Sequence, residues 1–208
     1  MTNSCENLYK SIKKKLMRHT FENSFKKSIL VKQMCLEKGF DDLENIAKTI
    51  ISSLKNNGKL MVCGNGGSAA DAQHLAAELL VRLKSDSNRG PIPAISLALD
   101  SSTMTACGND FSFDYVYERN VRALGNENDC LLVISTSGNS KNLILAINAA
   151  KRIKIKVCAL LGKDGGECAK LSDYSYIVPS KDTAAIQEAH IVAGHALMEI
   201  IENNVGSK

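Results

Sequence analysis

One stretch of the sequence, residues 59–84, constrains the fold most, because a short apolar run leads through glycines into an alanine- and leucine-rich segment. Leu60 to Cys63 has the length and apolarity of a buried strand. The segment after the glycine turn at residues 64–68 has the composition of a helix. A strand that opens through glycines into a helix offers free backbone N–H groups and the positive end of a helix dipole. This stretch therefore suits an anion or the hydroxyls of a sugar.

A polar stripe follows the expected helix, at spacings of three, four and four residues: Asp71, His74, Glu78 and Arg82. His74 and Glu78 project the same way from neighbouring turns. Taken alone, such a stripe is more often a solvated face with weak ion pairs. Its apolar flanks and its nearness to the glycine turn favour a ligand site, because ligands in open α/β sheets bind beyond the carboxyl ends of the strands.

The rest of the chain alternates short apolar runs with helical segments, the pattern of a parallel sheet covered on both faces. Strands are expected at residues 60–63, 94–99, 130–134, 157–161 and 174–178. Helices are expected at residues 5–38 (one or two), 41–57, 69–84, 100–107, 115–124, 143–152, shortly after 166, and 184–203. A polar turn is expected at residues 108–111. The fold class is therefore α/β.

Residues 1–40 are expected to form a helical segment before one α/β domain at residues 41–208, whose first helix Asp41 or Asp42 would cap. Phe21, Phe25 and Ile29 recur every four residues, the spacing of a packed helix stripe. Residues 1–38 carry a net charge of +6, but they lack the aromatic pattern and the docking motif of a nucleic-acid-binding segment. We expect this segment to pack on a partner subunit, with its lysines facing solvent.

The composition points to a soluble protein of a reducing compartment. No apolar run reaches the roughly 18 residues of a membrane helix, and the N-terminus lacks the apolar part of a signal peptide. We expect a cytoplasmic protein with no membrane partner. Seven cysteines are scattered with no Cys-x-x-Cys pair, so we expect small buried hydrophobes rather than disulfides or a zinc finger.

A second candidate site is the run Ser-Thr-Ser-Gly-Asn-Ser at residues 135–140, between an expected strand and a helix. Its hydroxyls and backbone N–H groups can converge on a phosphate dianion without a lysine. A helix cap with a turn would need only one or two of these hydroxyls. The density of donors favours phosphate binding, although the run is not a Walker loop.

The closing helix supplies a third candidate group, with Gln187, Glu188, His190 and His195. By helical periodicity Gln187 and His195 share a broad face, about 12 Å apart along the axis. They can meet one ligand only if both side chains lean inward or a neighbouring subunit completes the pocket. His190 is offset the other way and is expected to be an ordinary core or surface histidine.

Five motifs occur in an order that resembles one known family: GNGGSAADAQHLAAEL, the GNDF turn, ISTSGNS, LLGKDGGE and the IQEAH…H helix. Together they are similar to the phosphoheptose isomerases, a branch of the sugar isomerase (SIS) superfamily, from about Asp41 to the C-terminus. The resemblance implies a flavodoxin-like three-layer sandwich, with a five-stranded parallel sheet between helices. It also implies a cytoplasmic homotetramer with active sites at subunit interfaces.

The resemblance assigns roles by position. The matching residues are Glu78 and His195 for acid/base catalysis; His74, Glu78, Gln187 and His195 for zinc; Asn65, Gly66, Gly67, Ser68, Glu78, Asn109, Asp110 and Gln187 for the sugar; and Ser135, Thr136, Ser137 and Ser140 for the phosphate. Ala184 and Ala185 depart from the family pattern, in which an arginine commonly precedes the Ile-Gln pair. This departure bears on contacts to the sugar or to a neighbouring subunit.

The implied reaction is the isomerisation of sedoheptulose 7-phosphate to D-glycero-D-manno-heptose 7-phosphate, a step towards the heptoses of bacterial lipopolysaccharide or capsule. It moves a proton between C1 and C2 through an enediol, so it needs one group to remove a carbon-bound proton and another to serve the oxygens. A partly shielded carboxylate suits the first task and an imidazole the second. Zinc would polarise the carbonyl.

Two other functions compete with this one. The first is a non-catalytic binding module like the replication-initiator-associated protein, a SIS relative that lacks the catalytic Glu and His. The presence of Glu78 and His195 argues against it, whereas the basic N-terminus keeps it open. The second is isomerisation of another sugar phosphate on the same scaffold.

Overall fold

The structure is a computed structural model that describes residues 2–98 and 100–205, with side chains described from residue 13 onward. Leu99, which was expected in the second strand, and the side chain of Cys5 lie outside the described residues. In the described part of the chain, no helix has the length and apolarity needed to cross a membrane.

Five parallel strands form a single sheet in the order β2-β1-β3-β4-β5. Their bounds are β1 Leu60–Gly64, β2 Ala94–Ser96, β3 Cys130–Ser135, β4 Lys156–Gly162 and β5 Tyr174–Val178. This is the flavodoxin-like strand order, so the expected fold class is confirmed. The register pairs Leu60 of β1 with Ala94 of β2 and with Cys130 of β3.

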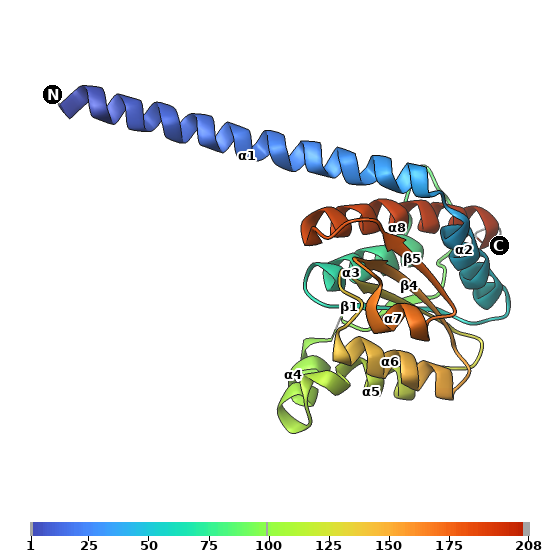
Figure 1. The fold of residues 1–208 in the computed structure, drawn as a ribbon. Coiled ribbons are helices and arrows are strands. Elements are labelled where there is room, and N and C mark those ends of the chain that lie inside the picture. Colours follow the sequence, from blue (N-terminus) through green and yellow to red (C-terminus); the bar gives the residue numbers. More distant parts are fainter. Residues whose placement is uncertain (1, 99, 206–208) are drawn as a thin grey trace.

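Helices cover both faces of the sheet, and this gives the three layers seen in Figure 1. Their bounds are α1 Thr2–Lys38, α2 Asp41–Lys55, α3 Gly67–Leu80, α4 Ser101–Asp110, the 3-10 turn η1 Phe113–Tyr115, α5 Val116–Leu124, α6 Lys141–Arg152, α7 Gly166–Leu171 and α8 Thr183–Val205. One face is covered by α2, α3 and α8, and the other by α4, α5, α6 and α7.

The core consists of two apolar clusters, one on each side of the sheet. Alternate residues of a strand point to opposite faces, so Leu60 and Val62 of β1 join the cluster under α3 and α8, while Met61 and Cys63 join the other. All of β1 and β3 is buried. Full burial of each large side chain contributes about 1.5–3 kcal/mol, which explains why these strands are continuous apolar runs.

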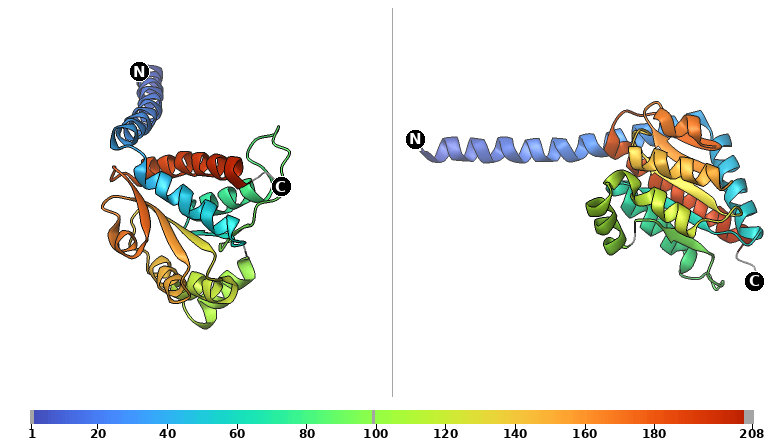
Figure 2. Two further views of the ribbon diagram at one scale, coloured as in Figure 1. Left: turned by 90° about the vertical axis from the view of Figure 1, so that its right-hand side faces the viewer. Right: turned by 90° about the horizontal axis from the view of Figure 1, so that it is seen from below.

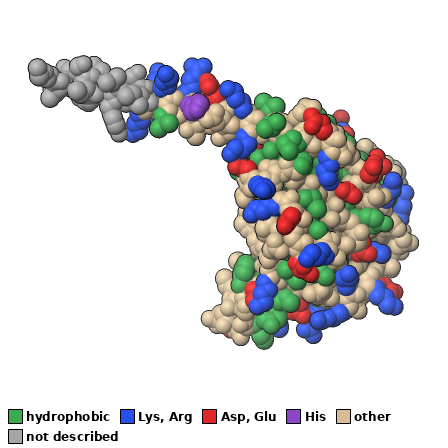
Figure 3. All heavy atoms as spheres, in the orientation of Figure 1, with side chains coloured by type: hydrophobic (Ala, Val, Ile, Leu, Met, Phe, Trp, Pro, Cys, Tyr) green, Lys and Arg blue, Asp and Glu red, His purple; other side chains and the backbone are tan. Residues whose placement is uncertain are grey.

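The N-terminal helix α1 is a single helix that projects far beyond the body of the protein, as both views of Figure 2 show. Only its last turns pack on the domain, where Val31 and Cys35 are buried in the core. Lys27 pairs with Asp182, just before α8, at 2.7 Å, and Lys32 pairs with Glu188 of α8 at 3.4 Å. Lysine and arginine side chains gather along the described part of α1 (Figure 3).

The expected apolar stripe on α1 is not covered within one chain. Phe21, Phe25 and Ile29 are 68%, 71% and 66% exposed. Monomeric proteins rarely leave such a row of large apolar side chains in water, because each one forgoes its burial energy. The stripe is therefore a free surface of the single chain.

Several boundaries differ from the sequence-based expectations. Phe40 holds the N-cap position of α2. Asp41 and Asp42 lie in the first turn of α2, where their negative charges interact favourably with the helix dipole, but neither side chain caps the helix. The second strand ends at Ser96. The expected turn at residues 108–111 is mostly helix, because α4 starts on the Asp100 cap and continues to Asp110.

Another difference concerns the polar stripe, since α3 ends at Leu80 and Arg82 lies beyond it. Arg89 explains this early end. Its guanidinium donates hydrogen bonds of 2.7 and 2.8 Å to the carbonyl oxygens of Glu78 and Leu79. These carbonyls lie at the helix end, where they have no partner within the helix, so an external donor satisfies them.

The six cysteines whose side chains are described are all buried and free, which confirms the expected role as small hydrophobes: Cys35, Cys63, Cys107, Cys130, Cys158 and Cys168. His190 is also a core residue. It is fully buried in α8, and its Nε2 lies 2.9 Å from the carbonyl oxygen of Leu161. Burial lowers the pKa of the His190 imidazole to about 4.

This burial predicts acid sensitivity. The unfolded chain binds a proton at His190 near pH 6.5, whereas the folded chain does so only near pH 4, so stability falls as the pH drops through this window. We expect the free energy of unfolding of the wild type to fall by up to about 3 kcal/mol more than that of His190→Gln over this range. Urea unfolding of both proteins at equal concentration and several pH values measures the difference. Parallel pH profiles would contradict it.

Candidate active site

The site lies where the chain leaves β1 and β3 in opposite directions. After β1 the chain enters α3, which packs on one face of the sheet, and after β3 it enters α6, which packs on the other. Adjacent parallel strands whose connections diverge leave a crevice at their carboxyl ends, and ligands of doubly wound sheets bind there. The glycine turn (residues 64–68) and the serine loop (residues 135–140) border this crevice.

The glycine turn needs its glycines. Gly66 has φ +57°, a conformation that a residue with a Cβ rarely adopts. A Cβ on Gly67 would lie 2.5 Å from the amide nitrogen of Gln187 in α8. The hydroxyl of Tyr117 donates a hydrogen bond to the carbonyl oxygen of Gly64. The turn is thus held by α8 on one side and by α5 on the other.

The serine loop uses some of its hydroxyls for its own shape. Ser135 is buried, and its Oγ accepts a hydrogen bond of 3.0 Å from the N–H of Gly138. The Oγ of Ser137 accepts a bond of 3.3 Å from the N–H of Asn139. Ser140 holds the N-cap position of α6, but its side chain makes no capping bond. Its hydroxyl and the N-terminus of α6 therefore remain for an anion.

Asn139 joins the serine loop to the next strand–helix turn. Its Oδ1 accepts a hydrogen bond of 3.1 Å from the N–H of Glu167 at the start of α7. A Cβ on Gly138 would overlap the carbonyl oxygen of Gly165, so the loops after β3 and β4 pack backbone to backbone. This packing fixes the serine loop from the β4 side.

Helices α3 and α8 bring three side chains of the expected site together. The Nε2 atoms of His74 and His195 are 2.8 Å apart, and the His74 Nε2 is 3.3 Å from Oε1 of Glu78. One candidate ligand atom from each residue lies within 4.8 Å of the others. The close approach of the helices depends on Gly194, where a Cβ would lie 2.7 Å from a methyl carbon of Leu75. Residues 121 positions apart thus face one another within one chain.

Gln187 lies near this cluster but has other partners. Its Nε2 donates a hydrogen bond of 3.3 Å to Oδ1 of Asp71, a buried carboxyl of α3. Burial raises the pKa of Asp71, and the hydrogen bond from Gln187 partly opposes this shift. In the described part of the chain, Oδ2 of Asp71 and Oε2 of Glu78 are buried without a hydrogen-bond partner. Buried carboxylate oxygens without partners are costly, so they mark places where a ligand atom or an ion fits.

The donor set fits a cation. Two imidazole nitrogens and a carboxylate oxygen are ordinary ligands of a divalent metal. The two Nε2 atoms face each other, and the second oxygen of Glu78 lacks a partner among the described residues. His74, Glu78 and His195 therefore form a possible metal site, with Gln187 beside it.

Asn109 and Asp110 are not joined to this cluster within one chain. They lie in the last turn of α4 with exposed side chains, and Nδ2 of Asn109 donates a hydrogen bond of 2.8 Å to Oδ1 of Asp110. In Figure 1, α4 stands at the margin of the molecule. Ser68 is in the first turn of α3, buried below the glycine turn.

The roles of three residues that hold the site were not predicted from the sequence: Asp71 as the partner of Gln187, Tyr117 under the glycine turn, and Asn142 in the first turn of α6. Asp71 belongs to the polar stripe, but its burial depends on α8. The contacts of Tyr117 and Asn142 span 53 and 77 positions, so local patterning could not reveal them.

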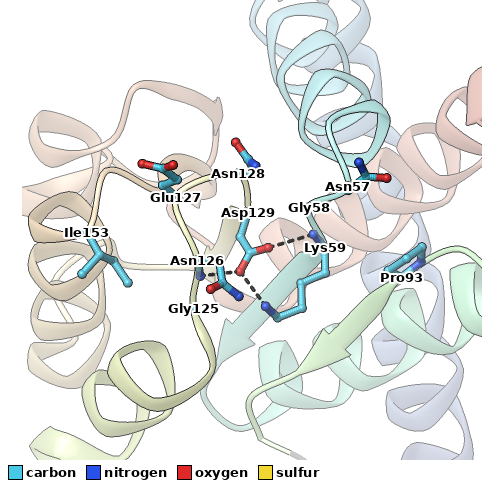
Figure 4. Close-up of a pocket in the computed structure, with 10 residues that line it drawn as sticks. All are labelled: Asn57, Gly58, Lys59, Pro93, Gly125, Asn126, Glu127, Asn128, Asp129 and Ile153. Carbon is cyan, nitrogen blue, oxygen red and sulfur yellow. Dashed lines mark hydrogen bonds and ion pairs between the residues drawn. The ribbon is translucent and has the colours of Figure 1, made fainter.

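A hollow of about 760 Å³ lies at the opposite edge of the sheet. Figure 4 shows its lining residues, which precede the strands. There Oδ1 and Oδ2 of Asp129 accept hydrogen bonds from the backbone N–H and Nζ of Lys59, and Oδ2 also accepts one from the N–H of Asn126. Asp129 has its partners already, so it ties the loops before β1 and β3 together.

Comparison with known proteins agrees with this geometry. Residues 25–162 match the SIS domain family. A phosphoheptose isomerase of Clostridium acetobutylicum is 44% identical over 91% of this chain and 96% of its own length, and one of Helicobacter pylori is 46% identical over 90% and 98%. The solved phosphoheptose isomerase of Neisseria gonorrhoeae, 41% identical, superposes with a TM-score of 0.83 over 90% of this chain and 99% of that one. The chain belongs to the SIS domain family and, within it, to the phosphoheptose isomerases.

Proposed function

We propose that this protein is an aldose–ketose isomerase that converts sedoheptulose 7-phosphate to D-glycero-D-manno-heptose 7-phosphate, in the cytoplasmic supply of heptose for bacterial lipopolysaccharide or capsule. The observation that carries this proposal is the meeting of Glu78 and His195 where α3 and α8 pack together. The names of the relatives support the same substrate.

Glu78 is the base for the carbon-bound proton in this proposal. Its carboxylate has a buried oxygen with no hydrogen-bond partner in the described part of the chain, and such an oxygen is poorly solvated and ready to accept a proton. It would take the proton from C1 of the ketose and return it to C2. His195 would move the proton between the two oxygens, since imidazole is both acid and base near neutral pH.

The remaining assignments place the substrate. The serine loop would bind the phosphate through Ser135, Thr136, Ser137 and Ser140. Asn65, Gly66, Gly67 and Ser68 of the glycine turn and Gln187 of α8 would bind the sugar, with Asn109 and Asp110 closing over it. The free hydroxyl of Ser140 and the start of α6 support the phosphate end, because a helix N-terminus attracts an anion.

A zinc ion would be held by His74, Glu78 and His195, with Gln187 as a fourth ligand. When bound, it supplies Lewis-acid polarisation of the sugar carbonyl. The facing Nε2 atoms and the unpartnered oxygen of Glu78 support this site, as does the chemistry of the donor set.

The functional unit proposed here is a homotetramer with active sites at subunit interfaces. Two observations support it. The apolar stripe of α1 is exposed in one chain, and Asn109 and Asp110 lie apart from the His74 cluster on an exposed helix end. A neighbouring chain would cover the apolar stripe of α1. It would also bring its own Asn109 and Asp110 to a site shared between subunits. The segment at residues 1–40 would serve this contact.

For the acid/base pair, we expect Glu78→Gln and His195→Asn each to lower kcat by about 10²–10⁴-fold, because each removes a proton-transfer group. A turnover assay with sedoheptulose 7-phosphate that detects the aldose product measures this. Glu127→Gln is the matched control, since Glu127 is exposed in the loop before β3, at the edge of the sheet opposite the crevice. Near-wild-type turnover of either site variant would refute the assignment.

For the phosphate, we expect Ser140→Ala to raise KM for the sugar phosphate about tenfold and to leave kcat nearly unchanged, because a hydrogen bond to a charged group contributes about 1.5–3 kcal/mol. Steady-state kinetics measures both constants. Ser172→Ala is the control, since that hydroxyl bonds only the carbonyl of Cys168 at the end of α7. An unchanged KM in Ser140→Ala would exclude this residue from the phosphate site.

For the metal, we expect the purified protein to carry about one zinc per chain and His74→Ala to retain less than about a tenth of it, because loss of a ligand weakens binding strongly. Elemental analysis by mass spectrometry measures the content, with His19→Ala as the control. Chelation should also lower the melting temperature of the wild type and of His19→Ala, but not that of His74→Ala. Full zinc content in His74→Ala would refute the site.

A further inference from the structure

Two asparagine side chains form a reciprocal pair across the crevice. Nδ2 of Asn65 donates to Oδ1 of Asn142 at 2.9 Å, and Nδ2 of Asn142 donates to Oδ1 of Asn65 at 2.9 Å. Asn65 belongs to the glycine turn after β1, and Asn142 to the first turn of α6, next to the serine loop. In the described part of the chain, these are the two side-chain hydrogen bonds that connect the turn to the loop and its helix.

The two partners differ in exposure. Asn142 is only 3% exposed, whereas Asn65 is partly exposed on the turn. A primary amide has two N–H groups and two oxygen lone pairs, and each amide here spends one of each on the other. Asn65 therefore keeps one N–H and one lone pair for a ligand, in an orientation that Asn142 fixes. Asn142 itself is too buried to reach a substrate.

The glycine turn and the serine loop are each held by separate contacts. Tyr117 bonds to the turn at Gly64, and Asn139 bonds the serine loop to α7. Neither contact crosses the crevice. The distance between the two loops therefore depends on the sheet below them and on the amide pair above it.

We propose that Asn142 is a positioning residue that, through Asn65, sets the span between the phosphate-binding loop and the sugar-binding turn. This inference rests on the proposed function, in which the loop binds the phosphate and the turn binds the sugar. The span then selects substrates by the length of the carbon chain between the phosphate and the reacting carbons. A substrate of the correct length has its C1 and C2 beside Glu78 and His195 when its phosphate is bound.

The consequence is a specific kinetic pattern. With the pair broken, the serine loop still binds phosphate, but the turn can shift relative to it. A misplacement of about 1 Å at a reacting centre can cost about 10²-fold in rate. Loss of Asn142 should therefore reduce turnover and length selectivity while phosphate affinity stays the same.

The test compares wild type, Asn142→Ala and Asn142→Asp. The aspartate keeps the shape and can accept a hydrogen bond from Asn65 but cannot donate one. Asn120→Ala is the matched control, because its partly buried amide donates one bond, to the carbonyl oxygen of Leu97, outside the crevice. Three quantities are measured: kcat and KM for sedoheptulose 7-phosphate, the same constants for the six-carbon fructose 6-phosphate, and the inhibition constant of inorganic phosphate.

We expect Asn142→Ala to lower kcat for the seven-carbon substrate about 30-fold or more. The kcat of Asn142→Asp should lie between those of Asn142→Ala and the wild type. The ratio of kcat/KM for the seven-carbon substrate to kcat/KM for the six-carbon substrate should fall at least about fivefold. The inhibition constant of phosphate should change less than about threefold. Asn120→Ala should match wild type. If Asn142→Ala does not fold, the same pattern in Asn142→Asp decides the question.

Three results would overturn the proposal in different ways. Folded Asn142 variants with wild-type kcat and wild-type length preference would show that the pair is merely structural, and the isomerase assignment would stand. A parallel loss of phosphate affinity would likewise show that Asn142 shapes the serine loop alone. A wild-type protein without activity on sedoheptulose 7-phosphate would overturn the proposed function itself, and this proposal with it.

Discussion

The divergence of the chain after β1 and β3 is the constraint on which the site depends. These neighbouring parallel strands send their helices to opposite faces of the sheet, so their carboxyl ends are left open between two backbone turns. Both turns lead into a helix start, where the first N–H groups have no partner within the helix, and both are shaped by glycines at positive φ, Gly66 and Gly138. Anion binding at this edge is therefore built into the backbone before any side chain is considered.

The chemistry of the site depends on how closely α3 and α8 pack. Gly194 lets α8 approach Leu75, and the next residue, His195, then meets His74. Arg89 ties the end of α3 to α8, since it bonds the carbonyl of Glu78 and lies 3.3 Å from Glu202. This packing leaves carboxylate oxygens of Glu78 and Asp71 without partners among the described residues, at a cost that only a ligand or an ion would offset. These unpaired oxygens destabilise the folded chain, so its stability comes from the rest of the core.

Local patterning was sufficient for most of the fold. The alternation of apolar runs and helices predicted all five strands, and β5 begins and ends where it was expected. The errors arose where tertiary contacts decide a boundary. Arg89 ends α3 early, and α4 runs through Gly108 because the Asp100 cap starts a helix that nothing interrupts. The stripe on α1 was predicted to pack on a partner subunit; it is exposed within one chain, and its packing on a partner stays a prediction.

The sequence by itself determined the alternation of strands and helices, the glycine turn, the serine loop and the residue types that suit proton transfer, because each of these depends on neighbours within a few positions. Only the tertiary structure decided that His74 meets His195 and that Asn65 pairs with Asn142. These contacts span 121 and 77 positions, and their geometry follows from helix packing and strand register. Distances of this kind are set by how closely whole elements approach, and no local spacing in a sequence records that.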